Sequence, residues 1–342
     1  MNALRQISTY QLQRIKLERV KTVLVTGATG FIGSHLVEHL LEMNQRVRVL
    51  TRPGSAAKNA LADHANLERF PAPLTVEGMT AAAEGCAVVY HLAGITRASS
   101  EAEFMWVNAE GTRAAAVGAQ RNGARLVYVS SLAAAGPGTP DAPRRVTDAP
   151  APITAYGRSK LEGEIRVRDT AALEFAVLRP PGVYGERDTD FLFAFQAAKF
   201  GVFPVLGNPD RAYTLVYASD LVRSIIACGE QATALSNTYF AGNAQPVAWG
   251  TILETIATVS GKIYKPLALP NFALEVAAAA GELGRVFGSP GLINRSRQRD
   301  LQAPGWVCDV TEAERDLGVI CDTPLKTGFS RTVDWYKQHR WL

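Results

Sequence analysis

The hydrophobic positions of the chain predict an alternation of short strands and longer helices. Short runs rich in β-branched residues are typical of strands buried on both faces. The predicted strands are Thr22–Thr26, Arg46–Leu50, Leu67–Phe70, Ala87–Leu92, Arg125–Ser130 and Phe175–Leu178. Helical patterns between them are Phe31–Asn44, Glu101–Arg121 and Ala155–Asp169. Strands that alternate with helices predict an α/β fold, a Rossmann-type doubly wound parallel sheet with ligands at the carboxyl ends of its strands.

After Gly185 this alternation weakens, and proline and glycine interrupt the pattern. The predicted strands in this half are Leu215–Tyr217 and Thr238–Phe240, and the predicted helices are Ser219–Glu230, Thr251–Ser260 and Phe272–Gly284. We therefore expect a Rossmann domain over residues 21–185. Residues 186–342 are expected to form mainly a smaller C-terminal α/β lobe, from which the chain can cross back to the sheet.

Positive charge is concentrated at the N-terminus. The chain has a net charge of +4, and its first 21 residues contain five cations and one anion, so the rest is neutral. We expect residues 1–20 to be a basic extension outside the fold, because they lack the apolar core of a signal peptide. A neutral body gives no reason to expect nucleic-acid binding.

The cysteines and histidines indicate the redox environment of the protein and whether it binds a metal. The four cysteines are far apart and form no CxxC pair. This pattern supports neither a disulfide framework nor a zinc site, and it favours a reducing, cytoplasmic environment. No apolar run approaches the ~20 residues of a membrane span. His35 and His39 lie one helical turn apart without a third ligand, so no metal site is expected.

A glycine-rich turn follows the first predicted strand. Residues 26–33 read TGATGFIG, with the spacing GxxGxxG between a strand and a helix. The first glycine permits the tight turn, the second a close approach to a pyrophosphate, and the third close packing of the helix on the strand. Free N–H groups at the start of that helix favour phosphate. The cofactor-binding residues expected here are Gly27, Thr29, Gly30, Phe31, Ile32 and Gly33.

The tip of the second strand indicates which dinucleotide is bound. A site that prefers NAD usually carries an acidic residue there, which binds the ribose 2′-hydroxyl. This chain instead carries Arg52, with Thr51 and Ser55 beside it. A guanidinium and hydroxyls suit a 2′-phosphate, so we expect NADP as the cofactor, with NAD as the alternative.

Tyr156 and Lys160 lie four residues apart in a predicted helix and therefore on one helical face. A neighbouring ammonium favours the phenolate, so we expect Lys160 to lower the pKa of Tyr156 towards working pH, as a general acid or base requires. Ser131 follows a strand that ends at the same sheet edge as the glycine turn, where it can hydrogen-bond a substrate oxygen or cap a helix. Asn108, on the preceding helix, can orient Lys160 directly or through a water.

These residues belong to a longer series of motifs. The motifs are TGATGFIG, HLAG (91–94), VNAEGT (107–112), VSS (129–131), YGRSK (156–160) and RPPGVYG (179–185). Their order and spacing resemble the extended short-chain dehydrogenase/reductase family, the NAD(P)-dependent epimerases and dehydratases. The resemblance covers about residues 21–342. It implies reversible hydride transfer between a nicotinamide dinucleotide and a secondary alcohol or ketone.

The resemblance also assigns roles to individual residues. The catalytic residues that it implies are Ser131, Tyr156 and Lys160, of which Lys160 also holds the nicotinamide ribose. Those along the adenine and ribose are Leu92, Ala93 and Gly94, and those beside the nicotinamide are Arg179, Pro180 and Val183. It further implies that the C-terminal lobe binds a small-molecule substrate, and that the protein is a homodimer formed through the two helices beside Tyr156.

Departures from the family pattern indicate which of the family's activities this sequence supports. Ala135 stands where nucleotide-sugar enzymes often have a tyrosine, and Leu132 and Ala133 are apolar where dehydratases tend to carry an acidic pair. Without that pair, β-elimination of water lacks its acid/base group. Pro73 stands where many members hold the adenine amino group with an aspartate. These traits resemble the reductase-type members, which include the 3β-hydroxysteroid-dehydrogenase-like and dihydroflavonol-reductase-like enzymes.

Two other functions remain open from the sequence. A nucleotide-sugar 4-epimerase or dehydratase would use the same catalytic residues with a retained cofactor. A catalytically silent dinucleotide sensor would have no need of a tuned phenol.

Some residues of the second half also allow two interpretations. The phenylalanines from Phe191 to Phe203 are either lobe core or an apolar substrate wall. Arg187 meets an anionic substrate group or lies in solvent. Arg297 and Arg299 stand where sugar-nucleotide enzymes contact phosphate.

Overall fold

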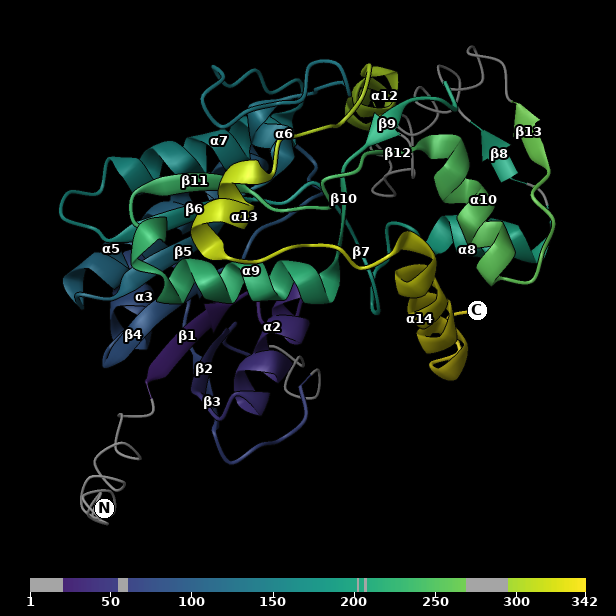
Figure 1. Cartoon of the computed structure of the whole chain (residues 1–342). Helices are drawn as coiled ribbons and strands as arrows, with labels where there is room; N and C mark the ends of the chain where they lie inside the picture. The colour runs from purple at the N-terminus through teal and green to yellow at the C-terminus, as the bar shows by residue number, and fades with distance from the viewer. Residues whose placement is uncertain (1–20, 55–60, 202, 206–207, 269–294) are drawn as a thin grey trace, which may run out of the picture.

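The structure is a computed structural model that describes residues 21–54, 61–201, 203–205, 208–268 and 295–342 (Figure 1). The basic extension and the predicted helix Phe272–Gly284 lie outside the described residues. Within the described residues, the other strands and helices predicted from the sequence are present, with bounds that differ by one or two residues at most ends.

A seven-stranded sheet carries the site, and all its neighbouring strands are parallel. The strand order is β11-β6-β5-β4-β1-β2-β3. The strands are β1 (Thr22–Thr26), β2 (Arg46–Thr51), β3 (Leu67–Pro71), β4 (Cys86–His91), β5 (Arg125–Val129), β6 (Phe175–Arg179) and β11 (Asn237–Phe240). The chain reverses direction across the sheet between β1 and β4, so the crevice beyond their carboxyl ends is where such a sheet binds ligands. The predicted Rossmann-type doubly wound fold is confirmed.

Helices cover both faces of this sheet. One face carries α2 (Phe31–Glu42) and α9 (Ala218–Glu230), which pack on each other, and the other carries α3 (Val76–Ala82), α5 (Gly111–Arg121) and α7 (Ala155–Arg168) (Figure 1). Side chains of a strand alternate between these faces. Accordingly, Val23 and Val25 belong to the core under α2 and α9, whereas Leu24 belongs to the core under α3 and α5.

The predicted helix Glu101–Arg121 contains a turn of π-helix. It begins as α4 (Glu101–Phe104), continues as the π-helical segment η2 (Met105–Glu110) and ends as α5. Such segments are rare and are frequent at functional sites. Here the π-helical segment contains Asn108, one of the predicted site residues.

Both α9 and β11 come from the second half of the chain. Strand β11 is the seventh strand of the sheet, and α9 covers one of its faces. The remainder of that half forms a lobe beside the sheet edge that carries the site (Figure 1). Its helices are α8 (Leu192–Lys199), α10 (Trp249–Val259), α12 (Arg295–Gln302) and α14 (Leu325–Gln338), whereas α13 (Thr311–Leu317) packs against α9 and β11. Its short strands are β8 (Phe203–Val205), β9 (Ala212–Tyr213), β10 (Leu215–Tyr217), β12 (Val247–Ala248) and β13 (Pro266–Ala268). They pair as β12-β9 and β13-β8, and β10 pairs with β7 (Gly182–Tyr184), which comes before Gly185 in the chain.

The phenylalanines of the lobe separate into two groups. Phe195 and Phe203 are fully buried, and the ring of Phe195 lies 5.3 Å from that of Tyr336 on α14. Phe193 and Phe200 instead expose 42% and 83% of their surface. The lobe core is therefore aromatic, and two of the phenylalanines lie on the outside of the lobe.

Two further observations concern membranes and metals. None of the helices in the described ranges is long and apolar enough to cross a membrane. The described residues contain no group of three potential metal ligands. His35 donates to the Glu186 carbonyl at 2.8 Å, and His39 lies 3.6 Å from the carboxylate of Glu42.

Candidate functional site

The turn between β1 and α2 leaves room for a phosphate. Gly27 has φ of +69°, and a Cβ there would lie 2.7 Å from the Ala93 nitrogen. A Cβ on Gly33 would lie 2.1 Å from the Gly27 carbonyl oxygen, so only glycine lets α2 approach the turn this closely. Gly30 caps α2 without a side-chain hydrogen bond. The N–H groups of the first turn of α2 therefore face the space where an anion would bind.

The cofactor-binding segments predicted from the sequence lie side by side. Thr29, Phe31 and Ile32 complete the turn and the start of α2. Leu92 and Ala93 follow β4, and their N–H groups donate to the carbonyl and the hydroxyl of Thr26, each at 3.2 Å. The turn after β1 and the segment after β4 thus lie together at the sheet edge where a crevice binds ligands in such folds. A glycine-lined crevice at a helix N-terminus fits the diphosphate of a dinucleotide.

A buried chain of hydrogen bonds connects this crevice to the π-helical segment. The Ala93 N–H donates to Thr26 Oγ1, which lies 2.8 Å from His91 Nδ1. His91 Nε2 lies 3.1 Å from Thr112 Oγ1, and the Thr112 hydroxyl donates to the carbonyl of Asn108. Because Thr112 uses its proton on that carbonyl, it must accept from His91 Nε2–H. Thr26 must then donate to Nδ1, which fixes the histidine tautomer.

His91 stays neutral in this chain. Burial lowers the pKa of His91 to about 3, and the nearby charge of Lys160 lowers it further. The imidazole is a structural link between the cofactor crevice and the helix that carries Asn108. His91 belongs to the HLAG motif, but neither its burial nor its two partners can be read from local sequence.

Asn108 positions two segments of the site. Its side-chain amide donates to Ser159 Oγ at 2.9 Å and to the Ile95 carbonyl at 3.0 Å, and its Oδ1 accepts from the Ile95 N–H at 2.8 Å. Asn108 therefore bonds the residue before Lys160 and the residue after Gly94. A Cβ on Gly94 would lie 3.0 Å from Asn108 Oδ1 and 3.9 Å from Lys160 Nζ, so all three residues are in contact distance.

Lys160 is buried beside the carboxyl end of β5. Its ammonium donates to the Val129 carbonyl at 2.8 Å and lies 4.5 Å from the centre of the Tyr128 ring. Burial lowers the pKa of Lys160 to about 7, against the opposing charge of Glu164. The amine is thus close to its titration point at neutral pH.

Tyr156 and Ser131 lie together at the end of β5. Burial raises the pKa of Tyr156 to about 12, against the opposing effect of the Ser131 hydroxyl, and the charges of Asp190 and Asp300 raise it further. The expected lowering of this pKa is wrong in direction, because burial raises it more than the Ser131 hydroxyl lowers it. Ser131 also caps the short helix α6 (Leu132–Ala135), accepting from the Ala133 N–H at 3.1 Å. The phenol therefore keeps its proton at neutral pH, as a proton donor requires.

The motif that follows β6 contacts the site through Pro180. The Pro180 carbonyl accepts from the Leu132 N–H at 2.8 Å, so this segment adjoins Ser131, and Val183 lies in β7. Arg179 does not line a cofactor surface. It forms two hydrogen bonds with the buried carboxylate of Glu164, at 2.8 and 2.7 Å, because its side chain is directed from β6 towards α7.

The other arginines considered from the sequence have different surroundings. Arg187 is partly exposed and forms two hydrogen bonds with Glu38 on α2 and one with Ser34. Arg52 is exposed at the tip of β2. Arg299 is exposed on α12, where its charge contributes to lowering the pKa of Glu101. The side chain of Arg297 lies outside the described part of the structure.

Comparisons with known proteins agree with this geometry. Residues 23–242 match the model of a family described as NAD dependent epimerase/dehydratase. A ceramide reductase of Caulobacter vibrioides is 31% identical, over 94% of this chain and 96% of its own. A UDP-glucose 4-epimerase of Vibrio cholerae is 25% identical, over 93% and 96%. Among solved structures, MoeE5 in complex with UDP-glucuronic acid and NAD has a TM-score of 0.74 at 22% identity, over 93% of this chain and 99% of that one.

Proposed function

The chain belongs to the NAD dependent epimerase/dehydratase family, and from this premise we propose that it is an NADP-dependent reductase of a ketone in a ceramide-like lipid. Enzymes of this family are NAD(P)-dependent dehydrogenases, reductases and epimerases, which interconvert a secondary alcohol and a ketone by hydride transfer. The observation that carries the proposal is the position of the Tyr156 phenol, which is hydrogen-bonded to the Ser131 hydroxyl beyond the carboxyl end of β5.

Each residue of the site has a separate role in the proposed proton transfer. A bound nicotinamide dinucleotide supplies the hydride. Tyr156 donates its proton to the carbonyl oxygen, and the Ser131 hydroxyl hydrogen-bonds the same oxygen and favours the phenolate that remains. Lys160 holds the nicotinamide ribose, and its charge stabilises the phenolate. Asn108 positions Lys160 through its bond to Ser159.

Dehydration and sugar epimerisation have less support in the residues after Ser131. Leu132 is buried and Ala133 is apolar, so no carboxylate is available there for β-elimination. Ala135 is buried in α6, where nucleotide-sugar enzymes often have a tyrosine. Arg187, one of the arginines considered for an anionic substrate, is hydrogen-bonded to Glu38.

The lipid substrate follows from the relative and from the lobe. The relative with 31% identity is named a ceramide reductase. In this chain, Phe191 and Trp249 are only partly buried over the aromatic core of the lobe and offer apolar surface. The test is NADPH oxidation by the purified protein with a long-chain keto-lipid, compared with UDP-hexose interconversion. NADPH oxidation with the lipid supports the proposal, and UDP-hexose turnover with a retained cofactor contradicts it.

The choice of NADP rests on Arg52. We expect Arg52→Asp to reduce the preference for NADPH over NADH by about 10- to 100-fold, because a charge-assisted hydrogen bond to the 2′-phosphate is replaced by repulsion. The ratio of kcat/KM for the two cofactors measures this. Arg121→Asp is the matched control, since Arg121 is also exposed but ends α5, at the opposite edge of the sheet. An unchanged ratio in Arg52→Asp would refute the role of Arg52.

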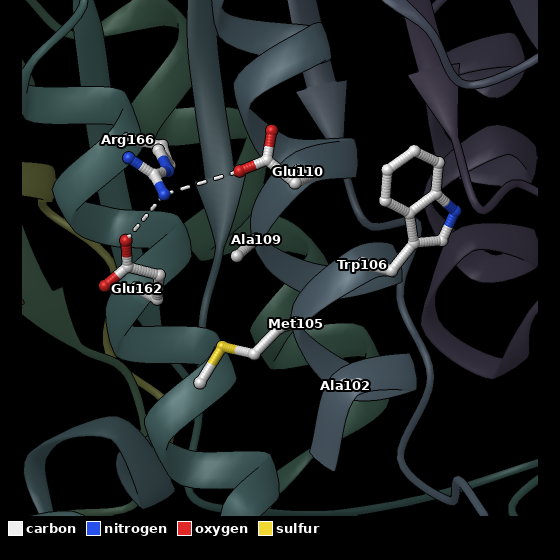
Figure 2. A pocket seen from close by; sticks show the side chains of 7 residues that line it. All are labelled: Ala102, Met105, Trp106, Ala109, Glu110, Glu162 and Arg166. Carbon is white, nitrogen blue, oxygen red and sulfur yellow. Dashed lines mark ion pairs between the residues drawn. The ribbon is translucent and has the colours of Figure 1, made fainter. Parts of the chain in front are cut away.

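We place the protein in the cytoplasm as a homodimer. The four cysteines are free and buried, which suits a reducing compartment. For the dimer, Figure 2 shows Trp106 standing out from the helix beside Met105 and Ala102, across from the ion pairs of Arg166 with Glu110 and Glu162. Trp106 exposes 72% of its surface, and Ile165 on the neighbouring α7 exposes 39%. An exposed tryptophan on an apolar helix face is typical of an interface.

This interface is tested by Trp106→Glu. A carboxylate at the centre of the interface would lie next to its copy, so we expect the dimer mass measured by light scattering to fall to the monomer mass. Met43→Glu is the control, because Met43 is exposed by 42% but lies at the end of α2. A wild-type protein that is already monomeric, or a Trp106→Glu dimer, would contradict the assignment.

The division of the chain follows from these roles. We assign the cofactor to residues 21–185 together with α9 and β11, and the substrate to the rest of residues 186–342.

A further inference from the structure

Exposed apolar side chains gather at the end of the small lobe. Eight large apolar side chains are exposed in the described part of the chain. Two of them, Trp106 and Ile165, belong to the proposed dimer face. Four others lie on the small lobe, namely Phe193, Phe200, Ile263 and Leu267, exposed by 42%, 83%, 76% and 49%. Single exposed apolar residues need no explanation, but a group of four on one lobe does.

The fold holds these residues close together. Strands β8 and β13 are parallel, and Phe203 pairs with Pro266. Phe200 and Ile263 each lie three residues before this pair, so the two segments enter the small sheet side by side. Leu267 lies in β13 itself. Figure 1 shows β8 and β13 next to each other at the end of the lobe, away from the seven-stranded sheet.

Buried side chains beneath the exposed ones hold this surface in place. Phe203 is fully buried, and its ring lies 5.4 Å from that of Tyr264. The Phe203 N–H donates to the Lys265 carbonyl at 3.1 Å. Phe193 lies in α8, and Phe200, seven residues later, caps the C-terminus of this helix, so the two lie on one side of it. The apolar side chains thus project from a packed core.

Lysines surround the same surface. Lys199 ends α8, and Lys262 and Lys265 flank Ile263, and all three are exposed. The acidic residue beside them is Glu254 on α10, whose charge contributes to raising the pKa of Tyr264. We call Lys199, Phe200, Lys262, Ile263, Lys265 and Leu267 the lobe tip.

We propose that the lobe tip is a docking surface for an anionic lipid bilayer. Apolar side chains among lysines are the pattern with which peripheral proteins enter the headgroup region, where the lysines meet lipid phosphates. A second copy of the chain is a poorer occupant, because a two-fold interface would set the three lysines against their own copies. The inference rests on this surface and does not depend on the proposed reaction.

The test is co-sedimentation of the full-length protein with two kinds of vesicles. We expect binding to vesicles that contain phosphatidylglycerol, falling as salt is added, and much weaker binding to vesicles of phosphatidylcholine alone. Replacing the three lysines by glutamine should weaken binding about a hundredfold, since each lysine near an anionic surface contributes about fivefold. The variant Phe200→Ser/Ile263→Ser should weaken it at least about tenfold.

Matched controls separate the lobe tip from other causes. Met43→Ser/Ile320→Ser removes two exposed apolar side chains elsewhere and should bind vesicles as the wild type does. NADPH affinity shows that each variant is folded, and it should be unchanged in all of them. A protein lacking residues 1–20 should also bind, because the lobe tip rather than the basic extension makes the contact.

Four outcomes would overturn the proposal. They are no binding of the wild type to phosphatidylglycerol vesicles, equal binding by the folded lobe-tip variants, loss of binding on removal of residues 1–20, and concentration-dependent self-association through the lobe tip without vesicle binding. Because vesicle binding is measured without turnover, its failure is distinct from a failure of the reductase assignment.

Discussion

Replacing Tyr156 with phenylalanine is expected to lower kcat by about 10²- to 10⁴-fold, the usual contribution of a positioned general acid. The variant loses only the hydroxyl that donates the proton, and its ring keeps the contact with Phe104, whose centre lies 6.1 Å away. The turn at Gly27 and the segment at Ala93 are untouched, so NADPH affinity should stay within about twofold of the wild type. Steady-state turnover and a direct binding titration measure the two effects.

A second tyrosine variant is the control for this result. Tyr239 lies on β11, two strands away from β5, and its hydroxyl donates to the Thr233 carbonyl. Tyr239→Phe should therefore leave kcat nearly unchanged. Retained turnover in Tyr156→Phe would remove this residue from its role, and loss of NADPH binding would show that it acts by holding the cofactor instead.

Replacing Glu164 with glutamine is expected to reduce the free energy of unfolding by about 3–5 kcal/mol. The Glu164 carboxylate is fully buried and accepts two hydrogen bonds from Arg179, one from Ser130 Oγ at 2.6 Å and one from the partly exposed Arg168 at 3.0 Å. Without its charge, the guanidinium of Arg179 would be left buried without a counter-ion, and its Nη1 already has no hydrogen-bond partner within the described structure. Urea unfolding measures the loss.

Two comparisons make this prediction specific. A double replacement of Glu164 and Arg179 by methionine should be more stable than Glu164→Gln, because no unpaired charge remains buried. Glu101→Gln, which breaks the exposed pair with Arg158, should cost less than about 1 kcal/mol. An equal loss in Glu101→Gln and Glu164→Gln would contradict the importance of burial.

The same pair predicts a dependence of stability on pH. Burial alone would raise the pKa of Glu164, but the hydrogen bonds and charge of Arg179 hold this pKa below its usual value. The stabilisation is therefore complete above the ordinary glutamate pKa and is lost as pH falls through the lowered one. Glu164→Gln should flatten this part of the stability profile.

The sequence predicted those features that local pattern controls. The alternation of strands and helices placed the parallel sheet, and the glycine spacing after Thr22–Thr26 placed the crevice at its edge. The order of strands follows from the family resemblance and from the handedness of the connections. Tyr156 and Lys160 lie on one helix, so their proximity was also predictable.

Features that depend on contacts distant in sequence were not predictable. Arg179 and Arg187 both looked available for ligands, but each has a carboxylate partner that only the fold brings near. The pKa of Tyr156 was expected to fall and instead rises, because burial cannot be read from a helical pattern. The π-helical segment around Asn108 and the link through His91 had no signal beyond the conventional motifs that contain them.

The most direct test of the reductase assignment is transfer of deuterium from NADPH that is labelled at the transferring nicotinamide carbon. The purified protein is incubated with the labelled cofactor and a long-chain keto-lipid, and the lipid product is examined by mass spectrometry. We predict an alcohol that carries deuterium on the former carbonyl carbon, and at least about a hundredfold slower formation of this alcohol with Tyr156→Phe. An unlabelled lipid, together with interconversion of UDP-hexoses by a cofactor that stays bound, would contradict the account.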